Sequence, residues 1–234
     1  MNNSNTNTSS FYKINVTNSD TLIVSFAGHG KMFGGIQKFE FVNFLEKNFK
    51  QFSLHFYIDK HVNSYHQGIF GITNDIDETV VYLKNEIKDY KNVVFLGVSS
   101  GGYAAILFGS LLNINYVLAF VPQTIRHGKN NCITEKYRDI SKYINDVTKY
   151  YVCGNTSITD PNDCHHISHC DRISHHSNVF IEKKANFDLK KMRDNGELYL
   201  ILRKLTTHTT TDNDNDNNNN NNNDDNQANN NEYN

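Results

Sequence analysis

The segment from Asn92 to Tyr103 constrains the fold of this chain more than any other. It reads NVVFLGVSSGGY, so a short apolar run passes directly into Gly-x-Ser-x-Gly. The apolar run is typical of a buried strand, and the small, apolar residues of 103–112 are typical of a buried helix. A serine between such a strand and such a helix is held on a sharp turn that exposes its hydroxyl. The segment therefore predicts that Ser99 is a nucleophile at the edge of a sheet.

Strand-like and helix-like segments alternate along the rest of the chain. The strand-like segments are apolar runs at 11–16, 21–27, 55–59, 93–96, 116–121, 150–153 and 178–181. Helical periodicity or helix-start signals mark 39–49, 74–90, 103–112, 136–148 and 189–205, with Asn74 as the expected N-cap of the second of these. This alternation predicts an α/β fold with a mostly parallel central sheet flanked by helices. Ligands of such sheets bind at the carboxyl ends of the strands, where Ser99 falls.

The two ends of the chain have compositions that do not support a core. Residues 1–10 are mostly Asn, Ser and Thr, and residues 206–234 are mostly Asn, Asp and Thr, with an unbroken Asn tract at 217–223. Segments with so little apolar surface cannot offset the entropy of the chain, so we expect both to be disordered. The remaining residues, 11–205, are enough for one domain with a sizeable core.

Charge and hydropathy narrow the possible partners and location. A formal net charge of -2 gives no electrostatic basis for binding nucleic acid or an anionic membrane. The sequence contains no run of about 18 apolar residues, so we expect no membrane span. The polar N-terminus lacks the apolar core of a secretory signal. We therefore expect a cytoplasmic protein with four free thiols, at Cys132, Cys153, Cys164 and Cys170.

A nucleophilic serine also needs backbone N–H groups that stabilise the oxyanion formed on its substrate. One is expected from Ser100, which follows the nucleophile at the start of a helix. The other is expected from Gly28 or His29, in the flexible loop after the strand at 21–27. Gly97 and Gly101 keep side chains out of the space where the strand and the helix meet.

With these features the chain resembles the α/β-hydrolase superfamily. The resemblance rests on residues 23–30, IVSFAGHG, and 97–105, GVSSGGYAA, and the order of elements extends it over most of 11–205. It implies a serine hydrolase that acts on an ester or thioester of a small acyl substrate, through an acyl-enzyme on Ser99 and without a cofactor. In this superfamily the catalytic acid follows the serine in the chain, and the histidine comes last. The acid is then Asp160 or Asp163, after the strand at 150–153, and Asp160 stands nearer the end of that strand.

The histidine departs from the pattern of the superfamily. The loop after the last strand, 182–188, reads EKKANFD, and Asn186 holds the place where the histidine is expected. An amide does not serve as a general base near neutral pH. Substitutes come from the histidine-rich stretch or the oxyanion loop: His165, His166, His169, His175, His176 and His29. Of these we name His166 as the candidate base.

The histidine-rich stretch, Asp163 to Asp171, also contains metal-capable side chains. On a helix, His165 and His169 share one face, and His166 and Cys170 share another. Either pair supplies two ligands of a zinc site, which needs three or four, and no second such pair occurs in the chain, so we predict no metal. Two other functions stay open: a hydrolase-like binding protein without competent chemistry, and a metal-assisted enzyme that uses this stretch.

Overall fold

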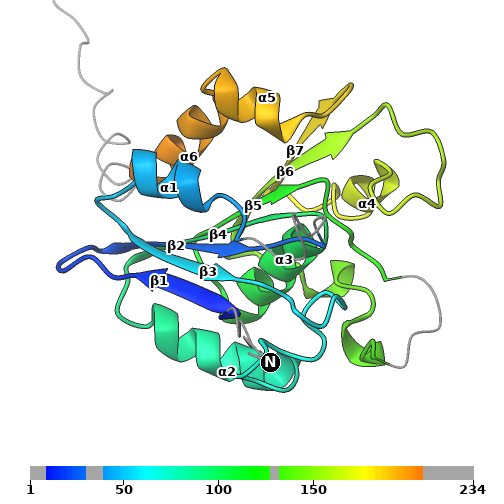
Figure 1. Cartoon of the computed structure of the whole chain (residues 1–234). Coiled ribbons are helices and arrows are strands. Elements are labelled where there is room, and N and C mark those ends of the chain that lie inside the picture. The colour runs from blue at the N-terminus through cyan, green and yellow to red at the C-terminus, as the bar shows by residue number, and fades with distance from the viewer. Residues whose placement is uncertain (1–8, 30–38, 127–131, 208–234) are drawn as a thin grey trace, which may run out of the picture.

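A computed structural model of the chain describes residues 9–29, 39–126 and 132–207. Its centre is a seven-stranded sheet with the strand order β1-β3-β2-β4-β5-β6-β7 (Figure 1). Neighbouring strands are parallel except β1, which pairs antiparallel with β3 at one edge. The strands are β1 (Phe11–Ile14), β2 (Thr21–Phe26), β3 (Ser53–Tyr57), β4 (Asn92–Val98), β5 (Tyr116–Phe120), β6 (Lys149–Asn155) and β7 (Val179–Lys184).

Helices cover both faces of the sheet (Figure 1). One face packs against α2 (Ile76–Ile87) and α3 (Ser100–Leu112), and the other against α1 (Val42–Asn48), α5 (Leu189–Asp194) and α6 (Glu197–Thr207). Every residue of β2 is buried, as are all residues of β4 but its last. Strands that are covered on both faces need such continuous apolar runs. The α/β architecture expected from the alternation of segments is therefore confirmed.

The prediction of a helix at 136–148 is wrong. This stretch holds two short 3-10 helices, η1 (Glu135–Tyr137) and η2 (Ser141–Tyr143), joined by loops. The Asp139 carboxylate accepts the Ser141 N–H, and the Asn145 side chain accepts the N–H groups of the two residues before β6. Short polar side chains that bond nearby backbone compete in this way with a continuous helix.

Two helix boundaries also differ from the sequence predictions. The helix expected at 189–205 is two helices, because Gly196 with a φ of 85° ends the first. The N-cap of α2 is Asp75, whose side chain accepts the Glu78 N–H at 2.8 Å. Asn74 lies one residue earlier, and its N–H donates back to the Glu78 carboxylate at 2.9 Å. The pattern is a capping box shifted by one residue.

The two segments expected to be disordered fall largely outside the described residues, at 1–8 and 208–234. At the described boundaries, Ser10 is buried and its hydroxyl donates to the Phe70 carbonyl, while α6 continues to Thr207. The folded part therefore reaches slightly beyond the predicted 11–205 at both ends. None of the helices in the described ranges has the length and apolar character needed to cross a bilayer.

Candidate active site

Ser99 lies on the sharp turn between β4 and α3. Its φ of 56° and ψ of -118° place a non-glycine residue in a sparsely populated region, at a cost of about 1–3 kcal/mol. The turn is fixed on both sides, because the Ser99 N–H donates to the Phe120 carbonyl and the Tyr103 N–H donates to the Ser99 carbonyl, each at 2.9 Å. This strained backbone is the geometry that a nucleophile turn requires.

Two glycines allow the strand and the helix to meet at this turn. A Cβ on Gly97 would lie 2.1 Å from the Gly101 carbonyl oxygen, and a Cβ on Gly101 would lie 2.1 Å from the Phe26 carbonyl oxygen. Both obstacles are backbone atoms of the core, so neither can move aside without displacing an element. The motif glycines are thus required by packing, which is the role that the sequence suggested for them.

The His165 imidazole lies against the Ser99 hydroxyl. Its Nε2 is 2.6 Å from Ser99 Oγ, within the range that direct proton transfer needs. This is the one hydrogen bond that Oγ makes within the described residues. His165 belongs to the loop between β6 and α4 (Ser168–Asp171), and not to the loop after β7. The histidine thus comes from the loop after β6, whereas the resemblance implied the loop after the neighbouring strand β7.

Asp163 is the acid that lies beside His165. Its Oδ1 is 3.9 Å from His165 Nδ1 and accepts the His165 backbone N–H at 2.7 Å. At 3.9 Å the Asp163 carboxylate acts on the ring through its charge and forms no hydrogen bond with it. Asp160, which stands nearer the strand end, accepts the Asn162 N–H at 2.9 Å and closes a local turn. The structure brings Asp163, and not Asp160, to the histidine.

His166, the candidate base named from the sequence, does not face Ser99. Its Nδ1 lies 2.9 Å from the Ser168 hydroxyl and accepts the Ser168 N–H at 3.2 Å. The reason is local: the N–H groups of His165 and His166 both bond back to Asp163, and this tight turn sends successive side chains in different directions. The neighbouring His165 therefore takes the position that we predicted for His166.

The rest of the histidine–cysteine stretch does not gather into one cluster. α4 has only four residues, so the paired helix faces expected from the spacing do not form. His169 is buried, and its Nδ1 accepts the Thr124 N–H at 3.2 Å. The His175 and His176 rings contact each other in a tilted arrangement, with ring centroids 4.1 Å apart. Within the described ranges, one group of three potential metal ligands lies within 4.8 Å: Asp163, Cys164 and His165.

Of the three backbone N–H groups expected to bind the oxyanion, those of Gly28 and His29 already donate to side chains. The Gly28 N–H donates to the Glu40 carboxylate at 3.0 Å, and the His29 N–H donates to the Ser100 hydroxyl at 2.9 Å. Burial raises the pKa of the Glu40 carboxyl. The Ser100 N–H has no acceptor in the part of the chain that the structure describes. It stands at the first turn of α3, where the helix dipole favours negative charge.

A buried carboxylate holds the His29 ring. His29 Nε2 lies 3.2 Å from Asp59 Oδ2, and Asp59 also accepts the N–H groups of Asn63 at 2.8 Å and Tyr65 at 3.0 Å. Burial alone would raise the pKa of Asp59, but its contact with His29 and the bonds from the backbone N–H groups bring that pKa below its usual value. Asp59 thus joins His29 to the loop that follows β3, and its place at a strand end was the sequence signal for this.

His66 is a buried histidine of the loop between β3 and α2, in contact with α3. His66 Nδ1 accepts the Thr134 N–H at 3.1 Å, so the ring proton is on Nε2, which lies 3.0 Å from the Tyr103 hydroxyl. The Tyr103 hydroxyl in turn donates to the Tyr137 carbonyl. Burial, with the charge of Arg126, lowers the pKa of His66 to about 4. A neutral His66 therefore joins α3 to the segment that precedes η1.

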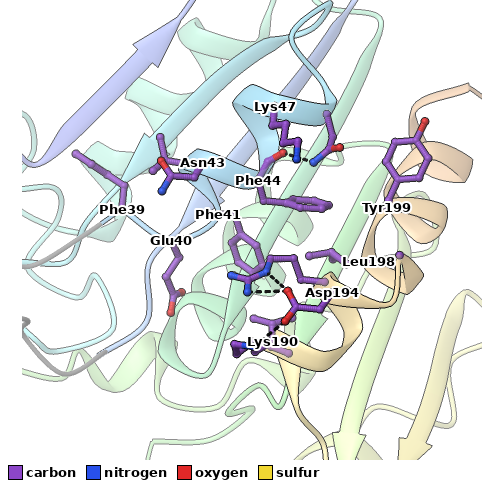
Figure 2. A pocket seen from close by; sticks show the side chains of 15 residues that line it. Phe39, Glu40, Phe41, Asn43, Phe44, Lys47, Lys190, Asp194, Leu198 and Tyr199 are labelled. Carbon is purple, nitrogen blue, oxygen red and sulfur yellow. Dashed lines mark hydrogen bonds and ion pairs between the residues drawn. The ribbon is translucent and has the colours of Figure 1, made fainter.

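A cavity of about 810 Å³ lies between α1 and the α5–α6 pair (Figure 2). Its walls combine aromatic and aliphatic side chains, such as Phe41 and Leu198, with charged and amide side chains, such as Lys47 and Asp194. Neither Ser99 nor His165 lines it. Glu40, which accepts the Gly28 N–H, is one of its wall residues, so this side chain links the cavity to the residues that follow β2.

Comparison with known proteins gives a match at the level of the fold. No protein-family model matches the sequence, and no curated protein does. The capsule O-acetyltransferase of Neisseria meningitidis serogroup A, solved as a mutant in complex with CoA, superposes with a TM-score of 0.59 at 13% identity, over 83% of this chain and 90% of that one. MGS-M2, an α/β-hydrolase enzyme from a Medee basin deep-sea metagenome library, gives 0.56 at 11% identity, over 86% and 96%.

A protein of unknown function from Staphylococcus aureus gives a TM-score of 0.53 at 13% identity, over 84% of this chain and 94% of that one. Identities this low establish similarity of fold and nothing further. This chain has an α/β-hydrolase-like fold, as the segments around Gly28 and Ser99 predicted from the sequence.

Proposed function

We propose that this protein is a serine hydrolase that acts on an ester or thioester through an acyl-enzyme on Ser99. The observation that carries the proposal is the 2.6 Å contact between Ser99 Oγ and His165 Nε2, on a strained turn at the carboxyl end of β4. A partly exposed serine with an imidazole in direct contact is the arrangement of an activated nucleophile. The α/β-hydrolase-like fold, shared with a solved acetyltransferase and a solved hydrolase, supports it.

The chemistry follows from this geometry. His165 Nε2 takes the proton of the Ser99 hydroxyl as Oγ attacks the acyl carbonyl, and the negative charge that develops on the carbonyl oxygen faces the Ser100 N–H. His165 then gives its proton to the departing alkoxide or thiolate, which leaves the acyl group on Ser99. Water, or a hydroxyl of an acceptor molecule, attacks the acyl-enzyme while His165 takes its proton. That proton returns to Ser99, and an acid or a new ester is released.

The second candidate is a hydrolase-like protein that binds a ligand without turning it over. Two contacts favour it. The Glu40 carboxylate occupies the Gly28 N–H, and the 3.9 Å gap between Asp163 and the His165 ring leaves the imidazole without a hydrogen bond to an acid. A protein of this kind keeps the fold and the serine turn but forms no acyl-enzyme.

Covalent labelling by an uncharged fluorophosphonate separates the two candidates. We expect the purified wild-type protein to be labelled, with mass spectrometry locating the label on Ser99, and Ser99→Ala to remain unlabelled. Ser174→Ala, which changes an exposed serine away from the turn, is the matched control and should label like wild type. Release of 4-nitrophenol from 4-nitrophenyl acetate beyond one equivalent per protein then shows turnover. A folded wild-type protein that takes no label would refute the hydrolase and leave the binding protein.

A further inference from the structure

Arg126 lies on the segment that follows β5, at the same edge of the sheet as Ser99. β5 pairs with β4, and the Ser99 N–H bonds the carbonyl of Phe120 at the end of β5. The same segment is fastened to the chain beyond β6, because Thr124 Oγ1 donates to the His169 carbonyl at 2.8 Å and the Thr124 N–H donates to the His169 ring. The backbone that carries Arg126 is thus held between the two elements that supply the candidate nucleophile and base.

The Arg126 guanidinium is partly buried and has no counter-ion among the residues that the structure describes. Its Nη1 donates to the neutral Gln123 side chain, and its Nε is buried without an acceptor. No carboxylate of the described residues forms an ion pair with it, whereas the nearby Arg138 pairs with Glu135 at 2.6 Å. Withdrawing a cation from water without an opposing charge is unfavourable, so an anion that binds to the Arg126 guanidinium offsets this cost.

The charge of Arg126 is close enough to affect the pKa values of side chains around the candidate site. Burial lowers the pKa of Arg126, and Tyr103, Cys164 and Asp59 act against that shift. Arg126 in turn helps to lower the pKa of His66. The guanidinium therefore lies within electrostatic reach of α3, of the β3–α2 loop and of the residue beside the candidate base. The Asp59 carboxylate is already held by backbone N–H groups of its own loop.

We propose that Arg126 binds an anionic group of the substrate, so that the ester or thioester attacked by Ser99 carries a carboxylate or a phosphate. This inference rests on the proposed hydrolase function and adds a substrate class to it. A guanidinium presents several N–H donors in a plane that matches the oxygens of either group, and partial withdrawal from water strengthens the pairing. The anion supplies a counter-charge that none of the carboxylates in the described part of the chain provides.

Matched substrates test the proposal and distinguish the two anions. Acetyl-CoA is compared with S-acetyl-N-acetylcysteamine, a neutral acetyl thioester, and mono-4-nitrophenyl succinate is compared with 4-nitrophenyl acetate. In the wild type we expect a higher kcat/KM for the anionic member of at least one pair. In Arg126→Gln the anionic-to-neutral ratio should fall about 10- to 100-fold, mainly through KM, since a charged hydrogen bond is lost. Arg126→Lys should recover part of the ratio, and Arg203→Gln, at an exposed arginine of α6, should leave it unchanged.

The outcomes separate failure of this inference from failure of the hydrolase. If wild-type Ser99 takes the uncharged fluorophosphonate label but Arg126→Gln keeps the wild-type ratio for both pairs, Arg126 has no part in recognising an anion. A wild-type protein that is not labelled at all overturns both proposals. Should Arg126→Gln fail to fold, Arg126→Lys decides instead, because an ammonium does not reproduce a planar fork, and a wild-type ratio in that variant contradicts the inference.

Discussion

His165→Gln should abolish most of the reactivity of Ser99. The glutamine side chain is close in length to histidine and can still hydrogen-bond the Ser99 hydroxyl, but it cannot take its proton. The quantity to measure is the second-order rate constant for labelling by an uncharged fluorophosphonate, together with the rate of acylation by 4-nitrophenyl acetate. Both depend on deprotonation of Oγ as it attacks, so both should fall together.

The size of the effect follows from the contacts of the hydroxyl. Oγ has one hydrogen-bond partner in the described structure, His165 Nε2 at 2.6 Å, so no other side chain there can substitute as the base. A positioned general base contributes about 100- to 10,000-fold, equivalent to about 3–5 kcal/mol in the activation free energy. The side chain of His165 is 34% exposed, so water can enter the space that glutamine leaves and act as a weak base. We therefore expect a loss nearer the lower end, about 100- to 1,000-fold.

The adjacent histidine provides the control. His166→Asn keeps an oxygen that can accept the Ser168 N–H, as His166 Nδ1 does now, and it should label within about twofold of wild type because His166 makes no contact with Ser99. A His165→Gln protein that is folded and labels at the wild-type rate would refute the assignment of the base. An equal loss in both variants would show that the loop conformation, and not one imidazole, controls the serine.

Three further expectations concern groups around this pair. Asp163→Asn should lower acylation only about fivefold, because a charge 3.9 Å from the ring and open to water contributes about 1 kcal/mol, while Asp160→Asn should match wild type in the same assay. Folding lowers the pKa of His66 from 6.5 to about 4 and so keeps the ring neutral. His66 therefore contributes up to about 3 kcal/mol to the free energy of unfolding above pH 6.5, and this contribution is lost as the pH falls toward 4. Urea unfolding between pH 7 and 4.5 should show a smaller loss of stability in His66→Asn than in wild type. Because burial raises the pKa of Glu40, its contribution to stability is present below about pH 4.5 and lost at higher pH, so Glu40→Gln should unfold at a higher urea concentration than wild type at pH 7, and an unchanged midpoint would contradict this.

The sequence was sufficient for the parts of the site that depend on local pattern. The apolar run before Ser99, the small residues after it and the two motif glycines determine a strand, a helix and a close backbone crossing, and each has a direct counterpart in the structure. The candidate acid and base, Asp163 and His165, were not determined in this way. Both come from a loop whose backbone is set by side-chain hydrogen bonds, and no periodicity indicates which of two adjacent histidines points inward.

The order of the strands accounts for the unusual source of the histidine. From β4, which carries Ser99, the sheet continues through β5 and β6 to β7, so the loop after β6 begins one strand nearer to the serine than the loop after β7. Histidine and acid then come from one short turn, two residues apart in the chain. In that turn the Asp163 carboxylate is used by the His165 backbone N–H, which fixes the loop but leaves the ring nitrogen 3.9 Å away. The same contact that delivers the imidazole to Ser99 therefore limits what the acid can add, and catalysis by this pair should depend far more on His165 than on Asp163.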